Sequence, residues 1–420
     1  MTPPAVRVPG DKSISHRALM FAALAQGDST LRGLLTSADI QSTAAALRAL
    51  GCDIPDLRAD SPVHVRGVGL HGLRTPQVVI DCGNSGTTAR LLLGILAGAG
   101  VVAELTGDAS LRSRPMARVT EPLGRMGARF EFVGGAGLLP LRVQGGQLRA
   151  IEFESPHASA QVKSALLLAG LVGGVAVKVR EPRLSRDHTE RMLAAQGATV
   201  RSFEEDGAAG VSLEPVPALR PLDLDVPGDF SSAAFLLALG LLRLPGIRVA
   251  GVGLNPTRTG MLDVLERMGA PVEVSNARSE GGEPVGDLGA APGPLTATTI
   301  EGAEVPALID EIPMIAALAA RAHGTTRIRG AAELRVKETD RIHALVQNLR
   351  ALGVEVEEHA DGLDVTGSAQ PMSGTVRTFG DHRIAMAFGV LGTLQGNHII
   401  VDDPECVQVS FPGFWDVIAA

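Results

Sequence analysis

A six-residue segment near the start of the chain occurs again in its middle. Val8–Ser13 reads VPGDKS, and Val226–Ser231 reads VPGDFS, 218 positions later. Each copy predicts the end of a strand, a Pro-Gly turn, a capping residue and then an apolar helix. The second copy has Phe230 at the position of Lys12 in the first copy. The two copies therefore share the turn and the helix start, but only the first has a positively charged side chain there. A chain that carries this element twice is expected to fold into two halves of similar architecture.

A second signal repeats along the chain. At five places a helical pattern ends in Gly and is followed by a short strand pattern, at intervals of 76, 70, 72 and 84 residues. Glycine readily adopts the left-handed conformation that ends many helices. The glycines are Gly51, Gly127, Gly197, Gly269 and Gly353. Gly51 and Gly269 are again 218 positions apart, so two independent signals indicate one duplication.

With a final helix expected at Pro412–Ala420, the chain contains six helix-and-strand units, three in each half. We therefore predict an α/β (α+β) protein of two domains. The first covers residues 11–227, and the second covers residues 1–10 plus 228–420. The chain would cross between them near 9–12 and 226–229. Ala5–Pro9 has strand character but no unit of its own, so we expect it to pair with the second domain.

The composition excludes several classes of protein. A chain of 420 residues is too long for one ordinary core, and its net charge of −8 argues against a broad nucleic-acid-binding surface. The longest apolar run, Leu91–Ala103, is shorter than the roughly 20 residues that cross a bilayer. The three cysteines lack paired spacing, and the start of the chain lacks a signal-peptide pattern. We expect a cytoplasmic protein with no nucleic-acid or membrane partner.

The first VPGD segment predicts an anion site. Ser13 and Arg17 lie one helical turn apart on the same face, and Lys12 stands at the helix start. Backbone N–H groups and the positive end of the helix dipole would add to the attraction for an anion. Cys82–Thr88 predicts a second anion site, because this Gly-rich turn follows the strand pattern Val78–Asp81 and precedes a helix. Tight packing is the alternative explanation of its glycines.

Polar residues at three other predicted helix starts are candidate ligands. Arg114 precedes Pro115, which favours the first turn of a helix, although an exposed arginine needs no ligand. Ser159 and Gln161 begin an apolar helix, where capping is the alternative role of Ser159. Arg186 stands just outside another helix.

The second half carries candidate acid–base residues. Asp310 follows an apolar segment, and we interpret it as the counterpart of Asp81 at a strand end, where a carboxylate is well placed as a general base. We expect the segment around Lys337, Glu338 and Arg341 to be helical, with the two cations on one face. A salt-bridged surface is the alternative reading.

Asp381, His382 and Arg383 form a charged trio at a Gly turn before an apolar helix. The chain lacks a G-x-S-x-G motif, which argues against a serine hydrolase. No His or Cys cluster has metal-ligand spacing, so we expect no metal.

Taken together, these segments resemble the 5-enolpyruvylshikimate-3-phosphate synthase family along the whole chain. The matching motifs are PGDKSISHR, GNSGTTAR, the Arg-Pro after LTGD, SAQ, SRDHTE, the Asp before the helix near residue 312, RVKETDR and DHRIAM. SAQVKSA and SRDHTERML look like the branch called class II. The resemblance implies an inside-out α/β barrel of two domains, each with three βαβαββ units.

The resemblance also implies a reaction: the enolpyruvyl group of phosphoenolpyruvate passes to the 5-hydroxyl of shikimate 3-phosphate, and phosphate leaves. This step belongs to the shikimate pathway to chorismate and aromatic amino acids. The implied catalytic residues are Asp310, Glu338 and Lys12. The implied ligands of shikimate 3-phosphate are Lys12, Ser13, Arg17, Ser159, Gln161, Arg186, Asp310 and Lys337. The implied ligands of phosphoenolpyruvate are Lys12, Asn84, Gly86, Arg114, Gln161, Arg341 and Arg383. No cofactor is required, and a monomer is expected.

Three residues depart from common members of the family: Ala160, Glu333 and Val409. Gly86 leaves room for the inhibitor glyphosate, so we expect inhibition. One alternative is the sister family of UDP-N-acetylglucosamine enolpyruvyl transferases, whose loop cysteine has no equivalent here. The other is a non-catalytic anion-binding protein of the same fold, for which Asp310 and Glu338 would both be unnecessary.

Overall fold

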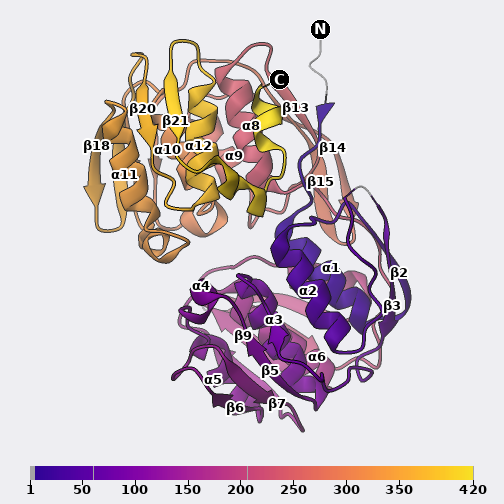
Figure 1. Cartoon of the computed structure of the whole chain (residues 1–420). Coiled ribbons are helices and arrows are strands. Elements are labelled where there is room, and N and C mark those ends of the chain that lie inside the picture. The colour runs from indigo at the N-terminus through magenta and orange to yellow at the C-terminus, as the bar shows by residue number, and fades with distance from the viewer. Residues whose placement is uncertain (1–4, 60, 206, 420) are drawn as a thin grey trace. The chain divides into compact units, whose positions relative to one another are not determined.

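The computed structural model describes residues 5–59, 61–205 and 207–419 and divides into two compact units (Figure 1). The N-terminal half contains residues 10–226, and the C-terminal half contains residues 5–9, 227–279 and 284–419. The short segment Glu280–Glu283 groups with the N-terminal half, although it is the tip of a hairpin whose strands group with the other. No helix of the described residues is long and apolar enough to span a membrane.

Three sheets form the strand framework of the N-terminal half, in the orders β12-β2-β3, β4-β5-β7-β6 and β8-β9-β11-β10. Each begins with a parallel pair and continues with antiparallel strands. The strands are β2 (Gln26–Arg32), β3 (Val63–Val68), β4 (Ile80–Asp81), β5 (Val102–Thr106), β6 (Arg129–Phe132), β7 (Leu141–Gln144), β8 (Ile151–Glu154), β9 (Val177–Glu181), β10 (Thr199–Glu205), β11 (Ala208–Glu214) and β12 (Asp223–Asp225). The helices are α1 (Lys12–Leu24), α2 (Ala38–Ala49), α3 (Gly86–Ala99), α4 (Ala109–Arg112), α5 (Ala117–Met126), α6 (Ala160–Gly173) and α7 (His188–Ala195).

The C-terminal half repeats this plan with the sheets β1-β13-β15-β14 and β16-β17-β19-β18, and then with the two-stranded β20-β21. Its strands are β1 (Ala5–Val6), β13 (Ile247–Gly253), β14 (Val272–Glu280), β15 (Glu283–Ala290), β16 (Thr299–Ile300), β17 (Thr325–Ile328), β18 (Glu355–His359), β19 (Gly362–Thr366), β20 (Ser373–Val376) and β21 (His398–Val401). Its helices are α8 (Phe230–Leu242), α9 (Gly260–Arg267), α10 (Ile312–Ala319), α11 (Arg341–Ala351), α12 (His382–Gly392), α13 (Phe414–Ala419) and the 3₁₀ helices η1 (Val305–Ala307), η2 (Ala332–Val336) and η3 (Pro404–Val409).

The structure reproduces the 218-residue offset at the level of individual hydrogen bonds. Helices α1 and α8 have the same length and begin at equivalent positions. Their caps are also equivalent, because Asp11 accepts from the N–H of Ile14 and Asp229 accepts from the N–H of Ser232. Strand β1 leads into the first copy and pairs with β13 of the second, whereas β12 leads into the second copy and pairs with β2 of the first. The pairing of Ala5–Pro9 expected from the sequence is therefore present at Ala5 and Val6.

The five predicted helix-ending glycines all have positive φ, between 77° and 120°. Another prediction needs correction. Val78 and Val79 are exposed rather than part of a buried strand, because only Ile80 and Asp81 pair in the sheet. Strands β14 and β15 form a hairpin that turns at Gly281-Gly282, both of which have positive φ.

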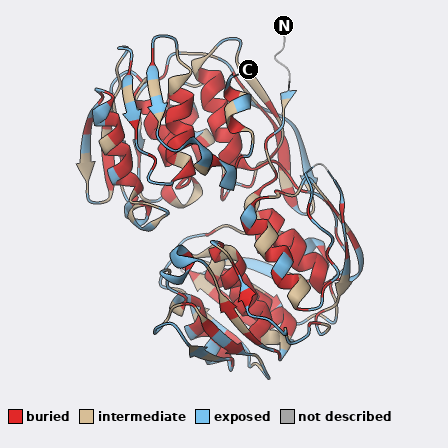
Figure 2. Ribbon diagram, viewed as in Figure 1, coloured by how far each residue is buried: buried red, intermediate tan, exposed pale blue. Residues whose placement is uncertain are grey.

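The core of each half is built around helices that are buried on all sides. These are α1, α3 and α6 in the N-terminal half and α8, α10 and α12 in the C-terminal half. Figure 2 shows the contrast between these helices and the strands around them, which are partly exposed. A buried helix must either satisfy the free N–H groups of its first turn or direct them at a ligand. The start of each central helix is therefore the place to look for a site.

Helices α3 and α6 approach each other closely through glycine. A Cβ atom at Gly94 would lie 2.1 Å from the backbone oxygen of Ala165, a separation that real side chains do not tolerate. Because both partners are helical backbone, neither can move without shifting a whole helix.

Gly94→Ala is therefore expected to lower the free energy of unfolding by about 1–3 kcal/mol or more, through overpacking. Gly124→Ala on α5 is the matched control, because a Cβ atom at Gly124 would meet nothing within 4 Å. This control should raise stability by about 0.5–1 kcal/mol, since alanine is the better helix former. Urea denaturation of both variants measures the difference, and equal stabilities would contradict the close approach.

Candidate active site

The start of α1 holds a lysine that is tethered but still reachable. Asp11 caps the helix, and the next residue, Lys12, places its Nζ atom 2.5 Å from Asp39 Oδ2. The side chain of Lys12 is 31% exposed. The turn before it requires glycine, because a Cβ atom at Gly10 would lie 1.9 Å from the oxygen of Gly33. A cation is thus fixed beside the first turn of a buried helix.

Arg17 lies one turn further along α1 and is buried. Its Nε donates to Thr189 Oγ1 at 2.7 Å, its Nη2 to Ser164 Oγ at 2.9 Å, and its Nη1 to the oxygen of Ser13 at 3.0 Å. Burial lowers the pKa of Arg17 to about 10, which leaves it protonated near neutral pH. Arg17 therefore links α1 to α6 and α7, a structural role that the sequence does not reveal.

The Gly-rich turn before α3 brings two arginines together. A Cβ atom at Gly86 would lie 2.8 Å from Arg90 Nη1 and 3.8 Å from Arg114 Nη1, so the glycine sits beside both guanidinium groups. Asn84 accepts from Arg114 Nη2 at 2.8 Å and donates to Asp108 at 2.7 Å, which holds Arg114 in place. Burial lowers the pKa of Arg90 to about 10. The turn has the geometry of an anion cradle.

Gln161 and Ser159 lie at the start of α6, next to this cradle. Gln161 accepts from Arg90 Nη1 at 2.8 Å and donates to Thr87 Oγ1 at 3.1 Å. Ser159 is the N-cap residue, but its side chain makes no capping hydrogen bond, so the capping alternative is wrong. Gln161 joins the start of α6 to the start of α3.

A buried ion cluster behind these residues was not identified from the sequence. Lys163 of α6 lies 2.7 Å from Glu181 and 2.8 Å from Glu190, and these three side chains are nearly inaccessible to solvent. Glu181 also accepts from the backbone N–H and the hydroxyl of Ser185, the residue before Arg186. The cluster thereby fixes the loop that carries Arg186. The only signal in the sequence was the position of Lys163, a charged residue directly before the apolar segment Ser164–Leu171.

In the C-terminal half, Asp310 lies among three guanidinium groups. Its carboxylate oxygens are 3.4 Å from Arg341 Nη1, 3.6 Å from Arg258 Nη1 and 3.8 Å from Arg383 Nη2. Arg383 Nη1 also donates to the backbone oxygen of Asp310 at 3.1 Å. The sequence did not reveal Arg258, because the side chain comes from a turn with no recognisable motif.

The expected match of Asp310 with Asp81 is wrong. Asp81 ends strand β4, whereas Asp310 lies in a turn two residues before α10. Asn84, two residues before α3, occupies the comparable place in the first half. Ile80-Asp81 and Ile309-Asp310 are similar in sequence but not in position. The segment between the strand and the helix is longer in the second half, so Asp310 lies further from its strand.

Arg341 is the most enclosed cation of this region. It is fully buried, donates to Asp381 and Glu338 at 2.7 Å each, and its pKa is raised by these carboxylates despite its burial. Glu338 is partly desolvated, which raises its pKa, but Arg341 and neighbouring positive groups outweigh this and hold the pKa at about 2. Glu338 is therefore ionised in this structure.

The segment around Lys337 is not the continuous helix that we expected. η2 ends at Val336, and α11 begins at Arg341 behind the N-cap Asp340, so Lys337 and Glu338 lie in the intervening loop. Asp340 caps the start of α11, because its side chain accepts from the N–H of His343, and Arg335 holds the same carboxylate at 2.7 Å.

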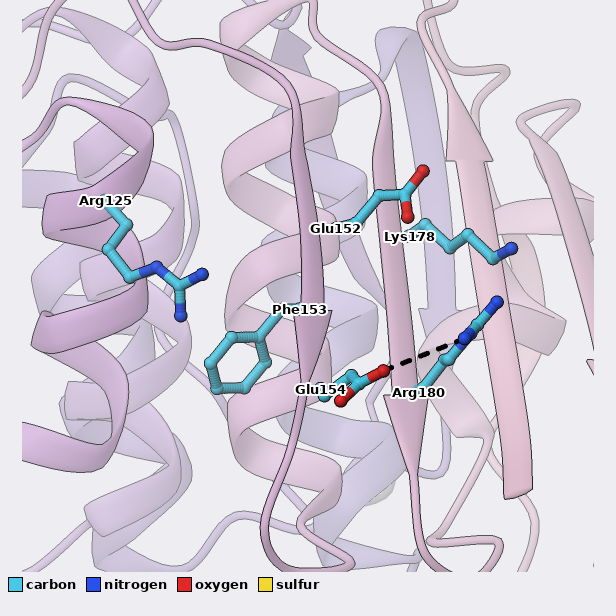
Figure 3. A pocket seen from close by; sticks show the side chains of 6 residues that line it. All are labelled: Arg125, Glu152, Phe153, Glu154, Lys178 and Arg180. Atoms are coloured by element: carbon cyan, nitrogen blue, oxygen red, sulfur yellow. Dashed lines mark ion pairs between the residues drawn. The ribbon is translucent and has the colours of Figure 1, made fainter. Parts of the chain in front are cut away.

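The hollow drawn in Figure 3 does not belong to this machinery. It has a volume of about 450 Å³ and is lined by Arg125, Glu152, Phe153, Glu154, Lys178 and Arg180. Three of its five charged side chains are already paired, since Arg180 contacts Glu154 and Glu205, and Lys178 contacts Glu205. Among the described residues, Glu357, His359 and Asp364 could geometrically hold a cation, but Arg329 lies 2.5 Å from Asp364 and occupies that carboxylate.

Removing the buried lysine should be costly. Lys163→Met leaves Glu181 and Glu190 without their cation, so the free energy of unfolding should fall by about 3–5 kcal/mol. Lys178→Met is the control, because Lys178 lies on the exposed face of β9 and pairs with Glu205 at 3.4 Å. The control should lose less than about 1 kcal/mol. Similar losses in both variants would rule out the buried cluster.

His382 should make stability depend on pH. Burial, followed by the nearby Arg383, lowers its pKa to about 4, whereas histidine in an unfolded chain titrates near 6.5. Between these values the unfolded chain binds the extra proton, so stability falls as the pH drops below 6.5. At pH 5 this histidine should account for a loss of about 2 kcal/mol relative to pH 7.5.

Denaturation of His382→Asn at both pH values is expected to show a correspondingly smaller loss. His71→Asn changes an exposed histidine and should behave like the unmodified protein. An unchanged pH dependence in His382→Asn would contradict the burial of a neutral imidazole.

Comparisons with known proteins identify the family. The family model of EPSP synthase (3-phosphoshikimate 1-carboxyvinyltransferase) matches residues 4–418. The 3-phosphoshikimate 1-carboxyvinyltransferase of Citrifermentans bemidjiense is 49% identical over 415 residues, which cover 98% of this chain and 95% of the relative. The enzyme of the same name from Gloeobacter violaceus is 51% identical over 417 residues, covering 99% and 95%.

Solved structures agree with the sequence comparison. An EPSP synthase from Acinetobacter baumannii has 39% identity and a TM-score of 0.89, with 99% of this chain and 95% of that chain covered. The enolpyruvyl transferase NikO from Streptomyces tendae shares the fold, at 20% identity and a TM-score of 0.78, covering 99% and 94%. This chain belongs to the EPSP synthase (3-phosphoshikimate 1-carboxyvinyltransferase) family.

Proposed function

We propose that this chain transfers the enolpyruvyl group of phosphoenolpyruvate to the 5-hydroxyl of shikimate 3-phosphate and releases phosphate. The observation that carries the proposal is the placement of two carboxylates, Asp310 and Glu338, on one buried guanidinium, that of Arg341. Anion binding alone would need the cation and not the two carboxylates. An addition followed by an elimination needs both a base and an acid.

Asp310 is proposed as the base. It would take the 5-hydroxyl proton while the hydroxyl oxygen attacks the central carbon of phosphoenolpyruvate. The nearby arginines would also stabilise the charge of the departing phosphate.

Glu338 is proposed to protonate the methylene carbon in the addition and to remove a proton from it as phosphate leaves. Because Arg341 holds Glu338 ionised, the carboxylate must gain a proton before it can donate one. An anionic substrate that binds Arg341 would weaken this hold and raise the pKa of Glu338. Substrate binding would in this way prepare the acid.

The remaining contacts follow from charge. For shikimate 3-phosphate, the helix starts of α1 and α6 supply N–H groups, and the uncommitted Ser159 hydroxyl supports a ligand role. We propose that this substrate contacts Lys12, Ser13, Arg17, Ser159, Gln161, Arg186, Asp310 and Lys337. Arg17 already donates hydrogen bonds to Ser13, Ser164 and Thr189. To bind the substrate as well, it would have to share these N–H groups with it.

For phosphoenolpyruvate, the cradle at Gly86 offers a cation pair in the N-terminal half, and Arg341 and Arg383 offer another in the C-terminal half. We propose that it contacts Lys12, Asn84, Gly86, Arg114, Gln161, Arg341 and Arg383. Lys12 would also act in catalysis, as a cation beside the leaving phosphate. Inhibition by glyphosate stays a prediction.

Finer features of the family are also part of the proposal. The buried helices with sheets outside them support an inside-out barrel in each half. The SAQVKSA segment supports membership of the class II branch of the family. The β20-β21 sheet has fewer strands than the other sheets, because η3 and α13 follow β21 where the other units have further strands. We propose a cytoplasmic monomer that needs no cofactor.

Phosphate release from phosphoenolpyruvate tests the function. Release should depend on shikimate 3-phosphate, and Glu338→Gln should abolish turnover while leaving the binding of shikimate 3-phosphate nearly unchanged by calorimetry. Glu121→Gln on the exposed side of α5 is the control and should turn over normally. Release that depends on UDP-N-acetylglucosamine would assign the sister activity, and no release with either acceptor would favour a binding protein.

A further inference from the structure

We propose that Glu311, acting through Ser231 and Arg258, is a positioning residue that holds Asp310 in the orientation and charge environment of a base. This inference rests on the proposed function, in which Asp310 removes a hydroxyl proton. Ser231, Arg258 and Glu311 are 3%, 4% and 1% exposed, and none of them is among the proposed substrate ligands. Their burial argues for a role carried through other side chains.

The three side chains form a chain of hydrogen bonds with a fixed direction. Arg258 Nη2 donates to Ser231 Oγ at 2.7 Å, and Ser231 Oγ is hydrogen-bonded to Glu311 Oε1. A guanidinium group can only donate, so Ser231 accepts from Arg258 and its single proton must go to Glu311. Glu311 therefore fixes the hydroxyl, and the hydroxyl fixes the guanidinium.

The other end of Arg258 faces the proposed base. Arg258 Nη1 lies 3.6 Å from Asp310 Oδ2. Asp310 directly precedes Glu311 in the sequence. The turn that carries Arg258 is itself rigid, because Asn255 accepts from the backbone N–H and the hydroxyl of Thr257. An orientation set at Glu311 is thus transmitted to the oxygen that would take the proton.

The charges around Asp310 explain why a second carboxylate is useful. Arg341 comes from α11 and is shared with Glu338 and Asp381, and Arg383 and the buried His382 come from α12. Arg258 comes from the turn before α9 and lies 4.0 Å from Glu311. Three cations would make Asp310 a weak base if none were offset. Burial raises the pKa of Glu311, and the guanidinium of Arg258 opposes this shift by favouring the ionised carboxylate.

The duplication adds an independent reason to single out Ser231. It occupies in the second VPGD segment the position that Ser13 occupies in the first, on the first turn of α8. In the first half that position is a proposed substrate ligand. In the second half the hydroxyl is buried and bound to Glu311. The second copy would thus have exchanged a ligand for a support of the base.

Titration of Asp310 tests the inference without any substrate. Protein labelled with ¹³C at aspartate carboxyl groups gives the pKa of Asp310 by NMR, with its resonance assigned from its loss in Asp310→Asn. Glu311→Gln has nearly the same shape and can still accept from Ser231, but it lacks the charge. The pKa of Asp310 should fall by about one pH unit in this variant. An unchanged value would overturn the inference.

Steady-state kinetics test the hydrogen-bond chain. Ser231→Ala should lower kcat by roughly ten- to a hundredfold and leave the KM of both substrates within about twofold, since the serine touches neither. Ser231→Thr keeps the hydroxyl and should restore most of kcat. Ser232→Ala is the control, a buried neighbour on the same helix that should keep normal kinetics.

Two outcomes would overturn the inference: a normal kcat in Ser231→Ala, with or without a raised KM, or no recovery in Ser231→Thr. Failure of the proposed function looks different. In that case the unmodified protein would release no phosphate, while the titration of Asp310 in Glu311→Gln would still decide whether Glu311 controls this carboxylate.

Discussion

The buried starts of the central helices are the constraint on which the rest of this structure depends. Each start presents N–H groups that lack a partner within the helix and must find an acceptor elsewhere. Part of this need is met by side chains of the chain itself, such as Asp11, Ser85 and Asp381. The remaining positive potential, together with adjacent Lys and Arg side chains, creates positions where an anion is more stable than in water.

The two halves resolve that constraint with different chemistry. In the N-terminal half, the two arginines beside the start of α3 contact neutral amides, Arg90 that of Gln161 and Arg114 that of Asn84. In the C-terminal half, by contrast, each arginine near the helix starts is matched with carboxylates, as Arg341 is with Asp381. One half is thus suited to hold negatively charged groups, and the other also contains groups that can exchange protons.

The sequence indicated the repeated order of helices and strands, and it supplied most of the candidate residues, whose roles stay predictions. Repetition is visible in sequence because each copy needs the same Pro-Gly turn, cap and helix-ending glycine, as Gly51 and Gly269 illustrate. The sequence could not show which side chains meet between different helices and strands. The contacts of Glu181 with Lys163 and of Glu311 with Ser231 were therefore not predicted. The same limitation explains the wrong match of Asp310 with Asp81, where local similarity concealed a difference in the length of the turn.

The crossed pairing of β1 and β12 has a consequence for how such a chain could have arisen. Ala5 pairs with Arg248 and Asp223 pairs with Thr30, so the two contacts are related by the same 218-residue offset. Each copy donates its leading strand to the other in an identical register. This is the connectivity of a strand-swapped homodimer whose two subunits have been fused end to end. An ancestor encoding only one copy would have been incomplete as a monomer and complete as a pair.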